Sequence, residues 1–348
     1  MNQQTQKSSV FLSARFWIGI AISILCLWLA FRNVPFSEFG VSLAQANYWW
    51  LLPTIPFQFF AIWTRARRWM VLLNFYPAIK DSFWAQTVGY LFTNILPLRM
   101  GEVARVVVLA RRARIPAVQV ASSALVERLL DVATIVVMMV IILPFMQVPE
   151  IVVRAGIGFG SIVLIAIIAL VVTVRYREPS TRILRSILSR FPFLPLNTLL
   201  NRWNELVDGF SVLQNWRISV ESIVWTAGTW GSSIVIYFSI MKAFQPETYL
   251  YETLFLLVAL AFAVTVPSSP GFIGVFQFIG QQALVIPFAG KYTDSSALAI
   301  TIVSYLLYYL STTILGIIGL WLVGETFSSM IKTLTERNRK INLPNSIE

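Results

Sequence analysis

The sequence predicts an all-α protein built as a polytopic membrane helix bundle, and three observations point to this fold class. Apolar residues make up 57% of the 348 residues, and charged residues make up only 12%. Soluble domains contain about 45–50% apolar and about 25% charged residues. Apolar runs of membrane-spanning length recur along the chain, with arginines and lysines gathered at their ends. These polar residues are too few to cover the surface of a soluble globule of this size. We therefore expect much of the surface to face lipid.

The composition also excludes several chemistries. Histidine is absent, and Cys26 is the single cysteine. A disulfide framework, a thiolate or imidazole metal site and the histidine-dependent phosphatases, acyltransferases and proteases of membranes are therefore excluded. The net charge of +11 is carried by basic residues that flank apolar runs, which favours a topological role over nucleic-acid binding. We expect no cofactor, no metal ion and no nucleic-acid partner.

We predict six spans; five of them reach the length of about 17–25 residues that a spanning helix needs, and the first falls just short of it. They are Phe16–Phe31, Tyr48–Thr64, Ser122–Phe145, Val152–Val174, Ile218–Met241 and Ser296–Val323. The first is expected to remain as an anchor, because no small-x-small cleavage site follows it.

Basic residues set the expected orientation of these spans. Lys7 and Arg15 precede the first span, and further basic residues follow the last one. Arg65, Arg67 and Arg68 are interpreted as inner-face charges at the end of the second span. The prediction is a multi-pass protein of the inner (plasma) membrane with both termini in the cytoplasm.

Two further segments, 80–111 and 252–294, begin and end on one face and are interrupted midway. The first breaks after Pro97 and the second at Pro267–Gly271. As a helix, Phe83–Leu96 reaches about 21 Å, against a hydrocarbon core of ~30 Å. We predict two re-entrant hairpins that enter from opposite faces; the alternative is eight ordinary spans, two of them kinked.

The two halves of the chain then match in reverse, as in inverted-repeat transporters. Repeat A is 48–145 and repeat B is 218–323, within a single membrane domain over 1–330, and the substrate site is expected where the hairpin tips meet. The basic connector 175–217 is predicted to lie as an amphipathic helix on the anionic inner leaflet, with a solvated linker as the alternative. Residues 331–348 are predicted to be a basic cytoplasmic tail.

The first motif that could carry chemistry combines Arg99, Gly101, Glu102 and Arg105. Pro97 ends one helix, and Gly101 frees the backbone to start another. Glu102 and Arg105 are three residues apart, so they share a helix face and can pair. We interpret Arg99 and Arg105 as ligands of an anionic phosphate head group. The alternative is a shallow hairpin whose arginines reach out to the interface.

The second motif combines Glu127, Arg128 and Asp131. Glu127 and Asp131 are four residues apart and face the same way. Two carboxylates inside a span can pair with Arg99 or Arg105 and only neutralise them. Alternatively, they can carry a proton and couple it to transport.

The third motif is an uncharged break that contains Pro267, Ser268, Ser269, Gly271, Gly274 and Gln277. Hydroxyls and free backbone N–H groups at a helix start can cradle an anion. Close helix packing is an equally good explanation of the glycines.

These three stretches, in this order and with these separations, resemble the flippase-like membrane family typified by the membrane half of lysylphosphatidylglycerol synthase. The resemblance covers roughly Phe16 to Val323 and implies a multi-span bundle that moves or presents a lipid. Members usually close the third motif with a glutamate, whereas this chain has Gln277, so no charge-dependent role is carried over to that position. The segment after Val323 is too short for the aminoacyl-transfer domain of the bifunctional members, so we expect no lysyl transfer.

We therefore expect a lipid translocase rather than an enzyme, acting on an anionic phospholipid or a polyprenyl-phosphate lipid whose head group is its main partner. No GxxxxGK[ST] sequence is present, so movement is expected to be downhill or ion-coupled. One alternative is a non-catalytic partner of lipid- or glycan-synthesis enzymes. The other is a lipid-linked glycosyl or phosphoryl transferase.

Overall fold

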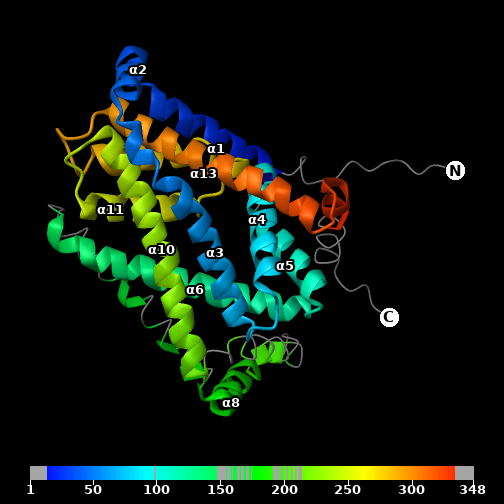
Figure 1. Cartoon of the computed structure of the whole chain (residues 1–348). Coiled ribbons are helices and arrows are strands. Elements are labelled where there is room, and N and C mark those ends of the chain that lie inside the picture. The colour runs from blue at the N-terminus through cyan, green and yellow to red at the C-terminus, as the bar shows by residue number, and fades with distance from the viewer. Residues whose placement is uncertain are drawn as a thin grey trace. The chain divides into compact units, whose positions relative to one another are not determined.

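The computed structural model describes residues 14–97, 99–146, 175–190 and 214–333, with scattered positions between 154 and 210. Within this part of the chain every regular element is an α-helix or a 3-10 helix, and no strand occurs. Figure 1 follows these helices along the chain. The all-α membrane helix bundle is thus confirmed, and the number of spans stays a prediction.

Three described helical segments are long and apolar enough to cross a membrane. They are α6 with its 3-10 extension η2 (Ala117–Phe145), α10 (Trp216–Phe244) and α13 (Asp294–Leu322), each of 29 residues. At 1.5 Å per residue each reaches about 43 Å, more than the ~30 Å hydrocarbon core requires. A bent pair, α1 (Ala14–Phe31) with α2 (Phe36–Gln45), passes the same test with an angle of 80° between its helices.

Two of the predicted spans, Tyr48–Thr64 and Val152–Val174, do not correspond to single described helices. The segment Tyr48–Thr64 divides into the 3-10 helix η1 (Tyr48–Leu51) and α3 (Thr54–Leu72), so the helix continues past the predicted end and includes Arg65, Arg67 and Arg68. This helix is not among the long apolar candidates. The predicted span Val152–Val174 lies outside the continuously described residues.

Both predicted interruptions are breaks between helices. The first separates α4 (Ile79–Ile95) from α5 (Met100–Ala113), and the second separates α11 (Leu250–Ala263) from α12 (Val275–Val285), with the short 3-10 helix η4 (Pro270–Phe272) between them. At 17 and 11 residues, α4 and α12 reach about 26 and about 17 Å, less than a bilayer core. The interruptions are present as predicted, and the choice between re-entrant hairpins and kinked spans stays a prediction.

The chain divides into two compact units. Unit 1 comprises residues 1–59, 84–108 and 233–348. Its core is an apolar cluster from the end of α10 and from α11, α12 and α13, in which Ile240, Leu256, Leu284 and Ile300 are fully buried. α1 packs on α12, and Ala30 of α1 shares a buried cluster with Leu298 of α13.

Unit 2 comprises residues 60–83 and 109–232. It contains α6, parts of α3 and α10, and α8 (Arg177–Leu188). The amphipathic helix predicted in the connector is present as α8, where Ile183 and Ile187 are 62% and 50% exposed. An exposed apolar face beside arginines suits an anionic lipid surface, although the position of α8 on a membrane stays a prediction.

Candidate functional site

The first break places Arg99 in an unusual backbone conformation. Pro97 follows the end of α4, and Arg99 has a φ of 56°, in the left-handed region that non-glycine residues rarely adopt. This conformation costs about 1–2 kcal/mol, so the surroundings must hold it. The Arg99 side chain donates a hydrogen bond to the Val264 carbonyl, and its guanidinium lies 5.9 Å from the centre of the Phe272 ring. Both contacts belong to the second break, so the two breaks meet within unit 1.

Arg99 differs from the other arginines of the motifs in its partners. Among the residues that the structure describes, no carboxylate lies within ion-pair distance of Arg99, and its side chain is exposed. Its interactions are one carbonyl and one aromatic ring, which leave the other donors of the guanidinium available. A phosphate oxygen can therefore approach this side chain without displacing a carboxylate.

Arg105 connects the two arms of the first hairpin. Its guanidinium lies 2.7 Å from a Glu102 carboxylate oxygen and donates to Gln86 Oε1 of α4 at 2.8 Å. The predicted Glu102–Arg105 pair is thus confirmed. The Arg105 side chain is only 3% exposed, which commits it to packing and pairing. Its placement therefore favours a structural brace over the predicted contact with a head group.

Gly101 allows the two arms to approach closely. A Cβ atom on Gly101 would overlap the Gly89 carbonyl and the Thr93 side chain of α4. A residue without a side chain is therefore required where α5 begins. Gly101 therefore allows close packing at the first break and supplies no side chain for binding.

The second break contains three residues with positive φ. Gly271, Phe272 and Gly274 have φ values of 70°, 62° and 88°. The Gln277 side chain accepts a hydrogen bond from the Gly274 N–H at 2.7 Å, so it caps the start of its own helix, α12. A neutral amide is sufficient for this cap, so the start of α12 needs no glutamate at this position. Pro267 is exposed at the beginning of the break.

Three neighbouring elements hold the second break in place. The Ser269 N–H donates to Ser23 Oγ of α1 at 2.9 Å. A Cβ atom on Gly271 would lie 2.8 Å from the Tyr305 hydroxyl of α13 and 3.3 Å from the Asn94 carbonyl of α4. Asn94 in turn donates to Thr312 Oγ1 of α13 at 3.0 Å. Sequence analysis missed Asn94 and Tyr305, because polar residues inside apolar helices carry no recognisable spacing.

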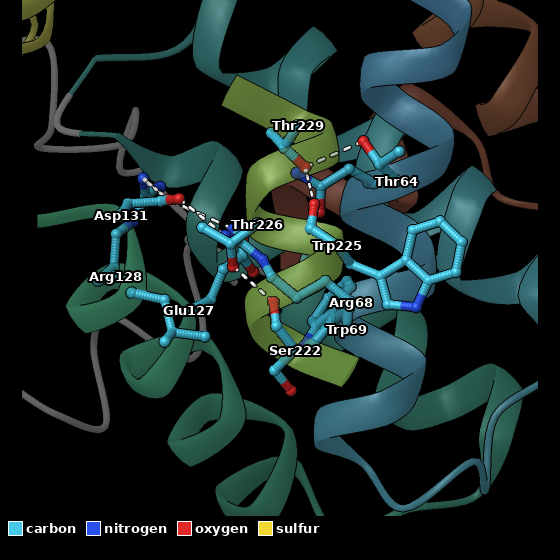
Figure 2. Close-up of polar contacts among 12 residues, drawn as sticks. Thr64, Arg68, Trp69, Glu127, Arg128, Asp131, Ser222, Trp225, Thr226 and Thr229 are labelled. Atoms are coloured by element: carbon cyan, nitrogen blue, oxygen red, sulfur yellow. Dashed lines mark hydrogen bonds and ion pairs between the residues drawn. The ribbon is translucent and has the colours of Figure 1, made fainter. Parts of the chain in front are cut away.

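Unit 2 contains a separate buried ion cluster, defined by Arg68, Glu127 and Asp131 (Figure 2). Arg68 lies 2.9 Å from a Glu127 oxygen and 2.8 Å from an Asp131 oxygen, and the side chain of Arg68 is fully buried. Thr226 accepts a hydrogen bond from Arg68, and Trp230 donates one to Asp131. Buried charges need such partners, because desolvation is costly for each unpaired ion.

This cluster corrects the pairing expected from the sequence. Neutralisation of Arg99 or Arg105 was one of two interpretations of Glu127 and Asp131, whereas the structure pairs both carboxylates with Arg68. Arg68 was interpreted as an inner-face topological charge, but α3 continues past the predicted span and buries it against α6. Arg128 is half exposed and lies 3.9 Å from Asp131, at the rim of the cluster.

The described residues contain no group of three or more acidic, histidine or cysteine side chains that could hold a metal ion. Comparison with family models matches residues 16–316 to the lysylphosphatidylglycerol synthase TM region. No curated protein and no solved structure matches the chain. The family match spans most of the sequence and includes both breaks and the ion cluster. The chain therefore belongs to the lysylphosphatidylglycerol synthase TM region family, and it is a membrane protein related to lipid modification or transport.

Proposed function

We propose that this protein is a lipid translocase of the inner membrane that moves an anionic, phosphate-bearing lipid between the leaflets. The proposal rests on the position of Arg99. This exposed arginine lies where the two helix breaks meet, and it has no carboxylate partner among the described residues. Family membership supports the coarser role in lipid modification or transport.

The arginines of the motifs and of the ion cluster differ in their counter-ions. Arg68 and Arg105 are buried and paired with carboxylates, so they already have their counter-ions. An arginine at the centre of a spanning helix costs about 2.5–3.5 kcal/mol on insertion scales. At such a depth the Phe272 ring would offset only about 0.5–1 kcal/mol of this cost for Arg99. A lipid phosphate supplies the missing counter-charge and fits the guanidinium in a bidentate manner.

Other residues have supporting roles in this proposal. The Glu102–Arg105 pair keeps the first hairpin folded, while Gly271 and Gly274 give the second break its shape. Helix breaks that face each other at the middle of a bundle are typical of transporter substrate sites. The arginine-rich segments that follow the predicted spans favour cytoplasmic termini.

Reconstitution in liposomes tests the proposal directly. Purified protein is incorporated into vesicles with a fluorescent phosphatidylglycerol, and the fraction of label that becomes accessible to an external quencher is followed over time. Faster equilibration than in protein-free vesicles is the expected result. Arg99→Gln should lower the rate at least about 10-fold, because a charge-assisted hydrogen bond contributes about 1.5–3 kcal/mol.

Arg32→Gln is the matched control. Arg32 also lies over an aromatic ring, 5.5 Å from the centre of Trp28, but outside both breaks. This variant should equilibrate the lipid like the wild type. If folded protein leaves the rate at the protein-free level, the translocase proposal is wrong and the non-catalytic partner of a synthesis complex takes its place.

A further inference from the structure

Two hydroxyl groups, one in the second break and one on α13 beside it, have no hydrogen-bond partner among the described residues. Tyr305 is only 7% exposed, and its hydroxyl has no partner among the residues that the structure describes. The Ser268 hydroxyl is buried and, within the same described residues, also without a partner. Buried polar groups in folded proteins are nearly always hydrogen-bonded, so each exception needs an explanation.

The Tyr305 hydroxyl adjoins the part of the break that Arg99 contacts, and Ser268 lies in the same break. The Tyr305 hydroxyl lies against Gly271, and Arg99 lies over the next residue, Phe272. Ser268 precedes Gly271 in the same short break. Tyr305 is fixed by the ring of Phe276, with centroids 5.5 Å apart. The break therefore gathers one guanidinium and two uncharged donors.

We propose that the hydroxyls of Tyr305 and Ser268 form, together with Arg99, a subsite for a lipid phosphodiester with a single negative charge. This inference rests on the proposed function, because it defines the lipid at the same site. Arg99 offers one uncompensated positive charge, while the hydroxyls add hydrogen-bond donors without adding charge.

The charge balance separates two kinds of lipid. A phosphomonoester carries about −1.5 to −2 at pH 7. One guanidinium would leave about half to one negative charge of such a group uncompensated in a low-dielectric site. A phosphodiester carries one negative charge, which Arg99 balances. Glycerophospholipids and glycosylated polyprenyl phosphates both contain such a diester, so the head groups of both lipid classes fit this charge balance.

Access to the hydroxyls requires movement of the break. Pro267 and Pro270 have no N–H group, so this stretch has fewer backbone hydrogen bonds to lose than a helix has. A small displacement of Gly271 away from α13 exposes the Tyr305 hydroxyl. Lipid binding is thereby coupled to a change in the contact between the break and α13.

Lipid-dependent thermal stabilisation and flipping rate, measured on the full chain, test the inference. The probes are two diesters, phosphatidylglycerol and a polyprenyl phosphoryl hexose, and two monoesters, phosphatidic acid and polyprenyl phosphate. We expect at least about 10-fold tighter binding of one or both diesters than of the matching monoester. The diester that binds identifies the source of the head group.

Tyr305→Phe isolates the hydroxyl. Diester affinity should fall about 10-fold or more, the range for a hydrogen bond to a charged acceptor. The melting temperature of lipid-free protein should stay constant or rise, because the substitution removes an unpaired buried group. A hydroxyl with a purely structural role would give the opposite pattern. Tyr237→Phe, in a tyrosine of α10 that packs on the unit 1 core, is the matched control.

The outcomes separate this inference from the proposed function. Equal binding of diesters and monoesters, or an unchanged diester affinity in Tyr305→Phe, overturns the subsite while flipping by the wild type still supports a translocase. If no lipid of either kind binds or is flipped by folded protein, both proposals are overturned.

Discussion

Replacing Arg68 with methionine tests the buried ion cluster of unit 2. The side chain of Arg68 is 0% exposed and lies within 3 Å of carboxylate oxygens of both Glu127 and Asp131. Removing the arginine leaves two carboxylates buried without their main counter-charge. Breaking one buried pair costs about 3–5 kcal/mol, so Arg68→Met should lower the free energy of unfolding by at least that amount.

The size of the effect should depend on which partner is changed. Glu127→Gln leaves the Arg68–Asp131 pair intact, at the cost of one charged hydrogen bond, about 1.5–3 kcal/mol. Asp131→Asn should cost more, because Asp131 faces Arg68 with both carboxylate oxygens and the amide would place an NH2 donor against the guanidinium. Neutralising Arg68, Glu127 and Asp131 together should recover part of the loss, since no unpaired charge remains.

Thermal unfolding in detergent, followed by tryptophan fluorescence, measures this order of stabilities. Arg128→Met is the control, because this arginine is half exposed and 3.9 Å from Asp131; exposed pairs contribute about 0–1 kcal/mol. The reasoning is refuted if Arg68→Met is as stable as the control, or if the triple variant is no more stable than Arg68→Met alone.

Three further substitutions test other features, each by the same unfolding measurement. Gly101→Ala should destabilise by about 1–3 kcal/mol through overpacking of the hairpin arms, whereas Gly40→Ala, which meets no atom within 4 Å in α2, should stabilise by about 0.5–1 kcal/mol; equal effects would contradict the close approach. Arg99→Gly should be more stable than Arg99→Ala by about 1 kcal/mol, because only alanine is strained at a φ of 56°; the reverse order would exclude the left-handed conformation. Glu252→Gln should destabilise by about 3 kcal/mol or more, because Glu252 is 1% exposed and paired with Lys291; an unchanged melting temperature would show that the pair contributes nothing.

The features that sequence predicted well depend on local chemistry. Pro97 and Gly271 lie in the breaks because neither residue suits a helix interior. The Glu102–Arg105 pair follows from a spacing of three residues within one helix. Helix existence likewise follows from long apolar runs, whereas the end of α3 at Leu72 does not, because arginines were taken as the edge of a span.

The features that sequence missed depend on contacts between distant segments. Arg68 and Asp131 are 63 residues apart in the chain, and nothing in their spacing distinguishes this pair from Arg99 or Arg105 with Asp131. Asn94 and Thr312 are 218 residues apart and lie inside apolar helices. Only the packing of α3 on α6, and of α4 on α13, selects these partners.

The arginines show how the missing information changes the functional interpretation. From sequence, Arg99 and Arg105 are equivalent ligands for a phosphate, and Arg68 is a charge at a span end. In the fold, Arg68 and Arg105 have carboxylate partners, whereas Arg99 has a carbonyl and a ring. Because a guanidinium removed from water requires a counter-charge, pairing inside the protein and binding of an anionic lipid are competing uses of the same charge. Substitution of Arg68 or Arg105 should therefore affect mainly stability, and substitution of Arg99 mainly transport.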